Sequence, residues 1–249
     1  MSRRQAHRLG AGPGGEARAR SGCGRRRDRA AAPDVSAASS PLVVKLGGSL
    51  AESKRLASIL KIVGASRQSC VIVPGGGAFA DAVRAAYKKH GLSQTVAHRM
   101  ALLAMHQTGM MLAGMHARLV PVETLAEMRR VLSESRVPVW MPLKLTASDA
   151  HVSADWRTTS DGLAARLAER LGGATVVLVK SCRVDRSASA ARLVRSGVVD
   201  PTFAEIVARA HLPWRVMGSG DERELARLLG VLHRSGRRSP AKRAIARRK

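Results

Sequence analysis

Residues 43–50, VVKLGGSL, place a lysine inside an apolar run and follow it with two glycines and a serine. An ammonium group buried without a partner is costly, so a strand that only filled the core would not carry Lys45. Lys45 therefore needs a partner. The two glycines and Ser49 directly after it make this loop a candidate site.

A second glycine loop, VIVPGGGAFADAV, leads from an apolar run into a helical pattern. Gly75, Gly76 and Gly77 stand at the expected helix N-terminus, where free N–H groups and the helix dipole favour an anion. The spacing Gly75-x-Gly77-x-x-Ala80 also fits a loose dinucleotide-binding pattern, which requires an acidic residue about twenty positions further on. Residues 82–122 contain no Asp or Glu. That absence argues against a nicotinamide or flavin enzyme.

A third segment, RTTSDGLAARLAERLGG, predicts a helix that begins near Ser160. Taken alone, Asp161 in its first turn would be an acid facing the helix dipole, worth roughly 0.3–1 kcal/mol. Beside the two glycine loops, a functional role for Asp161 is favoured over this one. Lys180 ends the apolar run that follows this helix.

The elements that must position these residues alternate along the chain. Apolar runs predict strands at 42–46, 70–74, 137–142, 174–180 and 214–218. Helical periodicity predicts helices at 56–63, 78–90, 96–120, 122–134, 161–171, 201–210 and 221–233. Such alternation is typical of an α/β protein. We expect a three-layer αβα sandwich with a central, mostly parallel sheet.

Charge divides the chain into a domain and two tails. Of the formal net charge of +25, residues 1–40 contribute nine Arg against three acids, and residues 234–249 contribute eight Lys or Arg against none. Both segments lack an apolar period, so we expect disordered basic tails around one domain at 41–233. The tails favour only non-specific contact with nucleic acid, since an aromatic content of 2% leaves no platform for stacking bases.

Cysteine usage and hydropathy limit the location of the protein. The three cysteines are far apart and form no CxxC pair, which fits a reducing compartment such as the cytoplasm. The most apolar window, MALLAMHQTGMMLAGM, is too short for a membrane span. We expect a cytoplasmic protein without a membrane partner.

The ordered motifs K-x-G-G-S, P-G-G-G and T-S-D resemble the amino acid kinase family over residues 42–232. That family includes aspartate, acetylglutamate, uridylate and isopentenyl phosphate kinases. The segments AHRMALLAMHQTG, PLKLTASDAHVSADWRTTSDGLA and VVDPTF are similar to those of the family's kinases of methanofuran biosynthesis and their methylotroph relatives. The resemblance implies an ATP-dependent kinase that converts a small phosphate monoester to a diphosphate in methanofuran-type cofactor biosynthesis. A family member that binds an anion without turnover and a kinase of a small carboxylate are the alternatives.

The resemblance also implies roles for residues, with ATP over the C-terminal half of the domain and the acceptor over the N-terminal half. The expected catalytic residues are Lys45, Asp161 and Lys144, the last as a second cation. The expected phosphate and nucleotide contacts are Gly47, Gly48, Ser49, Lys180 and Gly218. The expected acceptor contacts are Gly75, Gly76, Gly77, Arg99, Trp156 and Asp155, with Asp155 pairing with an amine. No metal motif is present, so Mg²⁺ is expected to be held mainly by ATP, and a homo-oligomer is expected.

The sequence departs from the family pattern at two places. Many members carry a D-V-D-G-V-Y-like stretch after the third of these strands, whereas this chain has VKSCRVDRSASA, with Lys180 where Thr is usual. His106 replaces an Asp often found in the long helix. Two interpretations of His106 stay open, a histidine satisfied between packed helices and a substrate contact.

Overall fold

The computed structural model describes residues 40–152 and 155–232. Apart from residue 40, the tails predicted at 1–40 and 234–249 lie outside the described residues. Within these ranges, no helix is both long enough and apolar enough to cross a membrane.

A single sheet forms the middle layer. Its strands are β1 (Leu42–Leu46), β2 (Cys70–Pro74), β3 (Leu119–Val122), β4 (Val137–Trp140), β5 (Val176–Val179) and β6 (Trp214–Met217). They are arranged in the order β3-β4-β2-β1-β5-β6, and all of the strand pairs that the structure describes are parallel. This confirms the predicted αβα sandwich with a mostly parallel sheet.

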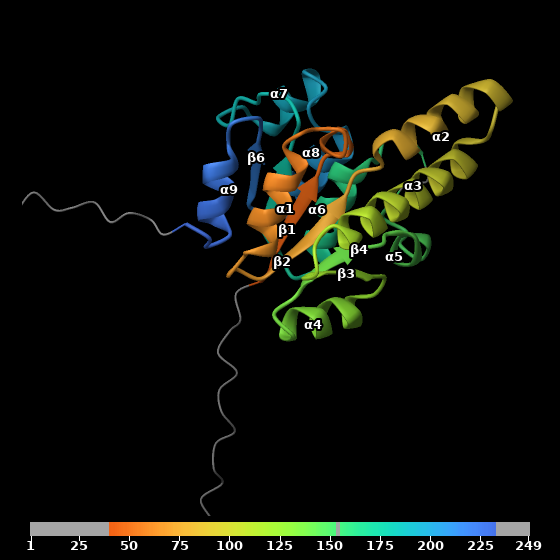
Figure 1. Cartoon of the computed structure of the whole chain (residues 1–249). Coiled ribbons are helices and arrows are strands. Elements are labelled where there is room, and N and C mark those ends of the chain that lie inside the picture. The colour runs from red at the N-terminus through yellow and green to blue at the C-terminus, as the bar shows by residue number, and fades with distance from the viewer. Residues whose placement is uncertain (1–39, 153–154, 233–249) are drawn as a thin grey trace, which may run out of the picture. The chain divides into compact units, whose positions relative to one another are not determined.

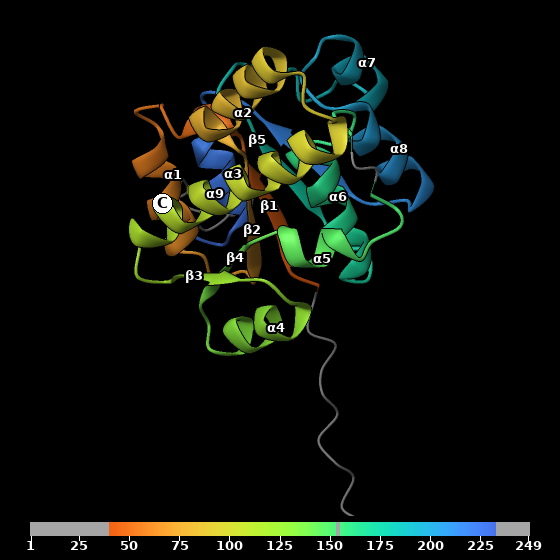
Figure 2. The same cartoon turned by 90° about the vertical axis from the view of Figure 1, so that its right-hand side faces the viewer.

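Helices cover both faces of the sheet (Figure 1). In chain order, the helical elements are the 3₁₀ turn η1 (Gly48–Leu50), α1 (Leu56–Gly64), α2 (Gly77–His90), α3 (Gln94–Gly114), α4 (Leu125–Ser133), α5 (Leu143–Ala147), α6 (Ser160–Arg170), α7 (Ala190–Arg195), α8 (Pro201–Arg209) and α9 (Glu222–Leu228). Side chains of α1 and α9 form the core on one face, and those of α4, α6 and α8 form the core on the other. Helices α2 and α3 run side by side as a hairpin (Figures 1 and 2).

The alternation of side chains along the strands decides which face the lysines occupy. Val43 packs in the core beneath α6, whereas Leu46 packs in the core beneath α1. Lys45 therefore shares the α6 side with Val43, because successive side chains of a strand point to opposite faces. By the same period, Lys180 follows Leu178 onto the α6 side. Both ammonium groups are thus directed toward the N-terminus of α6.

The helical stretch predicted over 96–120, with a break near Gly109 or Gly114 as the alternative, ends at the second of these glycines. Helix α3 ends at Gly114, and the chain then turns into β3, which was not predicted. Leu119 and Val120 continue the apolar spacing of the helix, so periodicity alone could not separate the two elements. Pro121 is tolerated within β3 because this strand lies at the edge of the sheet, where one row of N–H groups needs no partner.

Candidate active site

The predicted loops meet in a cleft of about 410 Å³ at the carboxyl ends of β1, β2 and β5. Strand β1 is the point from which the chain moves first to β2 on one side and later to β5 on the other. Open α/β sheets bind ligands at such switch points. The side chains and glycines that line the cleft include Lys45, Gly48, Ser49, Gly76, Gly77, Arg84, Thr159, Ser160, Asp161, Lys180 and Asp200.

A cluster of two lysines and one aspartate forms the floor of this cleft. Lys180 Nζ donates a hydrogen bond of 2.6 Å to Asp161 Oδ2, and Lys45 Nζ lies 2.8 Å from Oδ1. The Lys45 contact is an ion pair whose angle does not meet hydrogen-bond geometry, so Oδ1 has no aligned donor among the described residues. Lys45 and Asp161 are only 5% and 3% exposed. We call Lys45, Asp161 and Lys180 the lysine–aspartate cluster.

The charges of this cluster depend on one another. Burial by itself would raise the pKa of Asp161, but the two neighbouring ammonium groups outweigh it and hold that pKa below its ordinary value of 3.8. Burial lowers the pKa of Lys180, and repulsion from Lys45 lowers it further, while Asp161 opposes both effects. The cluster carries a net positive charge when both lysines are protonated. An anion bound in the cleft would therefore be attracted to it.

The two glycine loops touch each other directly. A Cβ atom on Gly48 would lie 2.4 Å from the backbone nitrogen of Gly77, and one on Gly75 would lie 2.2 Å from the backbone nitrogen of Gly48. Gly77 also has a φ of +53°, a left-handed conformation that side chains disfavour. The N–H groups of Gly47 and Gly75 donate to the carbonyl oxygens of Val179 and Leu46 at 2.9 and 2.8 Å, so the expected anion contact through these two N–H groups is wrong, and the glycines have a packing role besides. They allow the loops after β1 and β2 to pack backbone against backbone at the edge of the cleft.

Arg55 holds the other side of the cleft, and sequence reasoning missed it. Its guanidinium donates to the carbonyl oxygens of Lys180, Ser181 and Gly218 at 3.2, 3.2 and 2.9 Å, and it pairs with Glu222. These bonds join the start of α1 to the carboxyl ends of β5 and β6. The hydroxyl oxygens of Ser49 and Ser181 lie 2.7 Å apart.

Gly218 was predicted to contact the nucleotide, but its polar atoms have partners within the chain. Its N–H donates to the carboxylate of Asp221 at 2.8 Å, and its carbonyl accepts from Arg55. A Cβ atom there would lie 2.6 Å from the carbonyl oxygen of Cys182. The structure therefore gives Gly218 a packing role between β6 and the segment after β5.

Asp200 fixes the helix that carries Asp161. Its Oδ2 accepts hydrogen bonds from the N–H and hydroxyl of Thr159 and from the N–H of Gly162, at 3.0, 2.5 and 3.0 Å. Its Oδ1 accepts from the N–H of Phe203 at 2.6 Å and caps α8. One carboxylate thus satisfies N–H groups at the N-termini of two helices. The D-P pair at residues 200–201 predicts the cap of α8, but not the bonds to α6.

A smaller cavity of about 60 Å³ adjoins the cleft and shares Gly76 and Arg84 with it. Its wall is largely apolar, with Met105 from α3, and Trp156 closes one side. The Trp156 ring packs edge-on against Tyr87 at 5.5 Å, and the Arg84 guanidinium carbon lies 6.0 Å from its centre. Trp156 thus lies in the wall of the small cavity, and its expected contact with an acceptor stays a prediction. Arg84 was not predicted, although it faces both cavities.

Three other predicted site residues are not brought into either cavity. Lys144 is exposed on α5, the short helix that follows β4. Backbone hydrogen bonds lower the pKa of Glu127, and the positive charge of Lys144 contributes to the same shift. Arg99 is exposed and faces a separate cavity between α3 and α5. The Asp155 carboxylate accepts the N–H of Arg157 at 2.9 Å and does not line the small cavity. The cations that line the cleft are Lys45, Lys180 and Arg84, and neither Lys144 nor Arg99 is among the described lining residues.

His106 has a structural partner. Its Nε2 accepts the N–H of Leu143 at 3.0 Å, at the first turn of α5. Burial lowers the pKa of His106, which keeps the nitrogen available as an acceptor. The histidine is thus satisfied between packed helices.

Metal-ligating side chains do not gather in the described part of the chain, where no group of three or more His, Cys, Asp and Glu could hold an ion. Asp161 Oδ1 is a buried carboxylate oxygen without an aligned donor. Mg²⁺ generally uses one or two carboxylates together with substrate phosphates and water. The residues present therefore fit a nucleotide that brings its own Mg²⁺, with Asp161 as the available carboxylate.

Comparison with known proteins gives three findings. A model of the amino acid kinase family matches residues 40–183. The (5-(aminomethyl)furan-3-yl)methyl phosphate kinase of Methanocaldococcus jannaschii is 29% identical over 138 residues, and the match covers 55% of this chain and 63% of that protein, less than two thirds of its length. Two solved structures share the fold. Uridylate kinase from Archaeoglobus fulgidus is 20% identical with a TM-score of 0.58, and the match covers 76% of this chain and 95% of that one. UMP kinase from Bacillus anthracis is 15% identical with a TM-score of 0.56, and the match covers 78% of this chain and 93% of that one.

Proposed function

This chain belongs to the amino acid kinase family, a family of phosphotransferases, and from that premise we propose that it is a cytoplasmic, ATP-dependent kinase of a small phosphate monoester. Its product is the corresponding diphosphate. The similarity to the aminomethylfuran phosphate kinase supports a place in methanofuran-type cofactor biosynthesis.

The observation that carries this proposal is the lysine–aspartate cluster at the junction of the two glycine loops. Phosphoryl transfer asks little covalent chemistry of a protein, but it requires alignment and positive charge around the moving group. Lys45 and Lys180 supply that charge from fixed positions, because each is held by one oxygen of Asp161. The N–H groups of the loops after β1 and β2 supply the alignment.

Phosphoryl transfer to the acceptor phosphate needs no general base. The bond between the γ-phosphorus of ATP and its bridging oxygen breaks, and a bond to an oxygen of the acceptor phosphate forms. A phosphate monoester has a second pKa near 6, so that oxygen is largely ionised at neutral pH. The chain therefore has to position two anions and to offset their repulsion. Bound Mg²⁺ would neutralise part of the charge on the nucleotide phosphates, with Asp161 as its available protein ligand.

The groups on the acceptor side of the cleft favour an acceptor that carries a phosphate group over one that is wholly apolar. Arg84 lies where the cleft meets the small cavity, beside the loop of Gly75, Gly76 and Gly77. We assign the acceptor phosphate to this junction, because the Arg84 guanidinium, which pairs with the exposed Asp81, and the N–H groups of Gly76 and Gly77 converge there. The rest of the acceptor then occupies the small cavity, against Trp156 and Met105.

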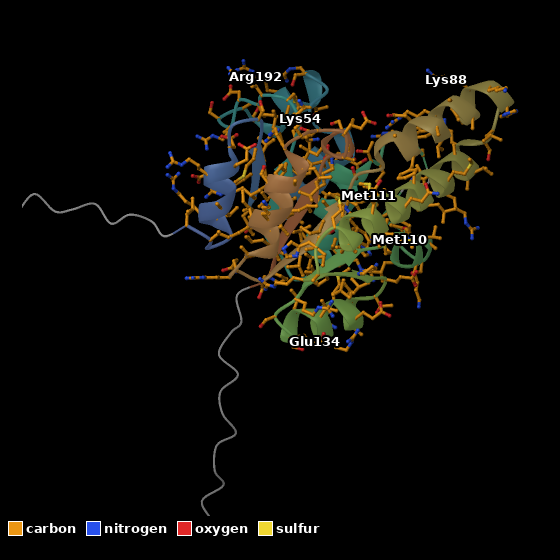
Figure 3. All side chains as sticks on the ribbon, in the orientation of Figure 1. Lys54, Lys88, Met110, Met111, Glu134 and Arg192 are labelled. Atoms are coloured by element: carbon orange, nitrogen blue, oxygen red, sulfur yellow. The ribbon has the colours of Figure 1, made fainter. Side chains whose placement is uncertain are left out.

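We also propose that the protein is a homo-oligomer that packs through α3. Val96, Leu103 and Met110 are 47%, 46% and 65% exposed at seven-residue intervals along this helix, and Figure 3 shows Met110 on the outside of the structure. An apolar stripe with that interval suits packing against a second copy of the same helix. Sedimentation velocity with the wild type and with Leu103→Glu tests this, and equal masses at the monomer value would contradict it.

The experiment for the reaction is a coupled assay of ADP release with purified protein, ATP and Mg²⁺. The acceptors are (5-(aminomethyl)furan-3-yl)methyl phosphate, UMP, isopentenyl phosphate, acetylglutamate and aspartate. We expect turnover with a phosphate monoester, with the aminomethylfuran phosphate preferred, and loss of turnover in Lys45→Met. Preference for aspartate or acetylglutamate would replace the proposal with a carboxylate kinase. Binding of ATP without turnover of any acceptor would favour an anion-binding protein.

A further inference from the structure

We propose that the buried imidazole of His98 recognises the end of the acceptor opposite its phosphate, by accepting a hydrogen bond from an amine or a hydroxyl group. This inference rests on the proposed function, because it assigns the second end of the same acceptor. It names a specificity-determining residue that is not part of the phosphate-binding loops.

The orientation of the ring follows from one hydrogen bond. His98 lies on α3, is 8% exposed, and has its Nδ1 at 3.2 Å from the backbone carbonyl oxygen of Asp155. A carbonyl oxygen can only accept, so Nδ1 must carry the hydrogen and donate it. In the neutral ring the other nitrogen, Nε2, is then a lone-pair acceptor. The Asp155 carbonyl thus selects the tautomer.

Nε2 of His98 is available to a ligand. It has no hydrogen-bond partner in the described part of the chain, yet it is not one of the fully enclosed polar atoms there. The ring lines the small cavity together with Arg84, Trp156 and Met105. It also lines the separate cavity that contains Arg99, so it stands in the wall between the two.

The charge state of the ring supports an acceptor role. Burial lowers the pKa of His98 below its ordinary value of 6.5, although the hydrogen bond and the charge of Asp155 oppose this shift. Among the described residues, the charged groups that line the two cavities around the ring are the cations Arg84 and Arg99 and the acid Asp149, whose carboxylate pairs with Arg166 and Arg170. The imidazole is therefore neutral near pH 7, and Nε2 can accept from an ammonium, an amine or a hydroxyl.

The side-chain acceptors that line the small cavity in the described part of the chain are the His98 ring and the hydroxyls of Thr158, Thr159 and Ser160. The Thr158 and Thr159 hydroxyls already bond to Thr202 and Asp200, and a hydroxyl can also donate, whereas Nε2 of the neutral His98 ring can only accept.

None of the described residues that line the cavity is an Asp or a Glu, so a donor group there meets no carboxylate. Leu102, Met105 and Leu163 make much of the wall apolar. The volume of about 60 Å³ corresponds to roughly four to six water positions, which suits one small ring with a short substituent. Asp155, predicted to bind an amine through its carboxylate, contributes its carbonyl instead.

The test compares three acceptor probes by isothermal titration calorimetry in the presence of a non-hydrolysable ATP analogue. They are (5-(aminomethyl)furan-3-yl)methyl phosphate and its analogues in which the aminomethyl group is replaced by hydroxymethyl or by methyl. We expect the methyl analogue to bind the wild type at least about tenfold more weakly than one of the two donor-bearing probes, since Nε2 is then left unpaired. The better of the amine and the hydroxyl probes identifies the natural donor.

Two variants assign the preference to the ring. His98→Phe keeps a ring without an acceptor nitrogen, and we expect the three probes to bind it within about twofold of one another. His98→Gln offers a carbonyl acceptor and should recover part of the discrimination. Met111→Leu is the matched control, an exposed position on the same helix outside the proposed interface stripe (Figure 3), and should keep the wild-type ratios.

Several outcomes would overturn this assignment. The wild type could bind all three probes equally, or it could bind none of them. His98→Phe could also keep the wild-type discrimination between the probes, as would follow if Nε2 served only the separate cavity. The wild-type comparison needs no variant, so it holds even if His98→Phe does not fold. Because binding is measured without turnover, discrimination in a protein with no kinase activity would refute the proposed reaction and leave the role of His98 standing.

Discussion

Neutralising Asp161 tests whether its negative charge holds the two lysines at the floor of the cleft. In Asp161→Asn the side chain keeps nearly the same shape, and an amide can still occupy the first turn of α6. If Asp161 were only an acid facing the helix dipole, the cost would be at most roughly 1 kcal/mol. The structure indicates a larger effect, because the carboxylate contacts Lys45 at 2.8 Å and Lys180 at 2.6 Å in a buried site.

The magnitude follows from what the substitution leaves behind. Removing one member of a buried ion pair typically costs about 3–5 kcal/mol, because the remaining charge is uncompensated. Here two ammonium groups remain, but the pKa of Lys180 is already lowered by burial and by Lys45, so this lysine can release its proton. That release limits the loss to the lower end, about 3 kcal/mol. For a domain of this size the melting temperature should fall by about 6–12 °C.

The assay is urea denaturation at pH 7 followed by fluorescence or circular dichroism. Glu134→Gln is the matched control, a carboxylate at the exposed end of α4 that pairs with Arg130 and should change stability by less than about 0.5 kcal/mol (Figure 3). Combining Asp161→Asn with Lys180→Met should recover part of the loss. A stability of Asp161→Asn within about 1 kcal/mol of the wild type would refute the inference that this carboxylate holds the lysines together.

Three further predictions concern the same site. Lys45→Met should lower kcat by about 10²-fold or more in steady-state assays with the fold intact, because it removes a charge that stabilises the moving phosphoryl group. The control Lys88→Met, on the exposed end of α2 (Figure 3), should leave kcat unchanged. Wild-type turnover in Lys45→Met would contradict the role of Lys45. Gly48→Ala should lower the free energy of unfolding by about 1–3 kcal/mol in urea, since its Cβ would lie 2.4 Å from a backbone nitrogen. In the control Gly114→Ala the added Cβ meets open space, so the free energy of unfolding should hardly change. Equal effects of the two substitutions would contradict the close packing of the loops. Finally, the pKa of Asp161 in the folded protein is below 3.8, so its ion pairs stabilise the fold fully above about pH 4 and are lost as the pH falls through that lowered pKa. At pH values below 4, the urea midpoint of the wild type should therefore decrease more steeply with falling pH than that of Asp161→Asn. Parallel curves for the two proteins would argue against this role of Asp161.

The sequence predicted the parts of the site that depend on local pattern. Lys45, both glycine loops and Asp161 stand at junctions between strands and helices, and parallel strands bring such junctions to one edge. Their roles stay predictions, but the structure brings them together. Lys180 could have been placed more firmly, because the period of β5 directs it to the same face as Lys45. Lys144 was favoured as the second cation instead, since α5 was not foreseen.

The parts that could not be predicted depend on how helices pack. Arg84 and His98 lie on α2 and α3, and which of their faces lines a cavity is decided by the crossing of those helices over the sheet. Arg55 acts through backbone carbonyls that are more than a hundred residues away in sequence. Asp200 was recognisable as a cap, but a cap shared with α6 requires α6 and α8 to lie side by side. Such pairings leave no local pattern.

The segment between Lys180 and Asp200 is fastened at both of its ends. At its start, Arg55 binds the carbonyls of Lys180 and Ser181, and at its finish Asp200 is bound to the N-terminus of α6. The exposed residues between these anchors can therefore exchange composition without moving the lysine–aspartate cluster, whereas Ala188, Leu193 and Val199 are buried in the core. This is consistent with a chain that has the ordered motifs K-x-G-G-S, P-G-G-G and T-S-D but carries VKSCRVDRSASA in place of the D-V-D-G-V-Y-like stretch. Exchanging the exposed residues of this segment would therefore vary one wall of the cleft while the floor stays unchanged.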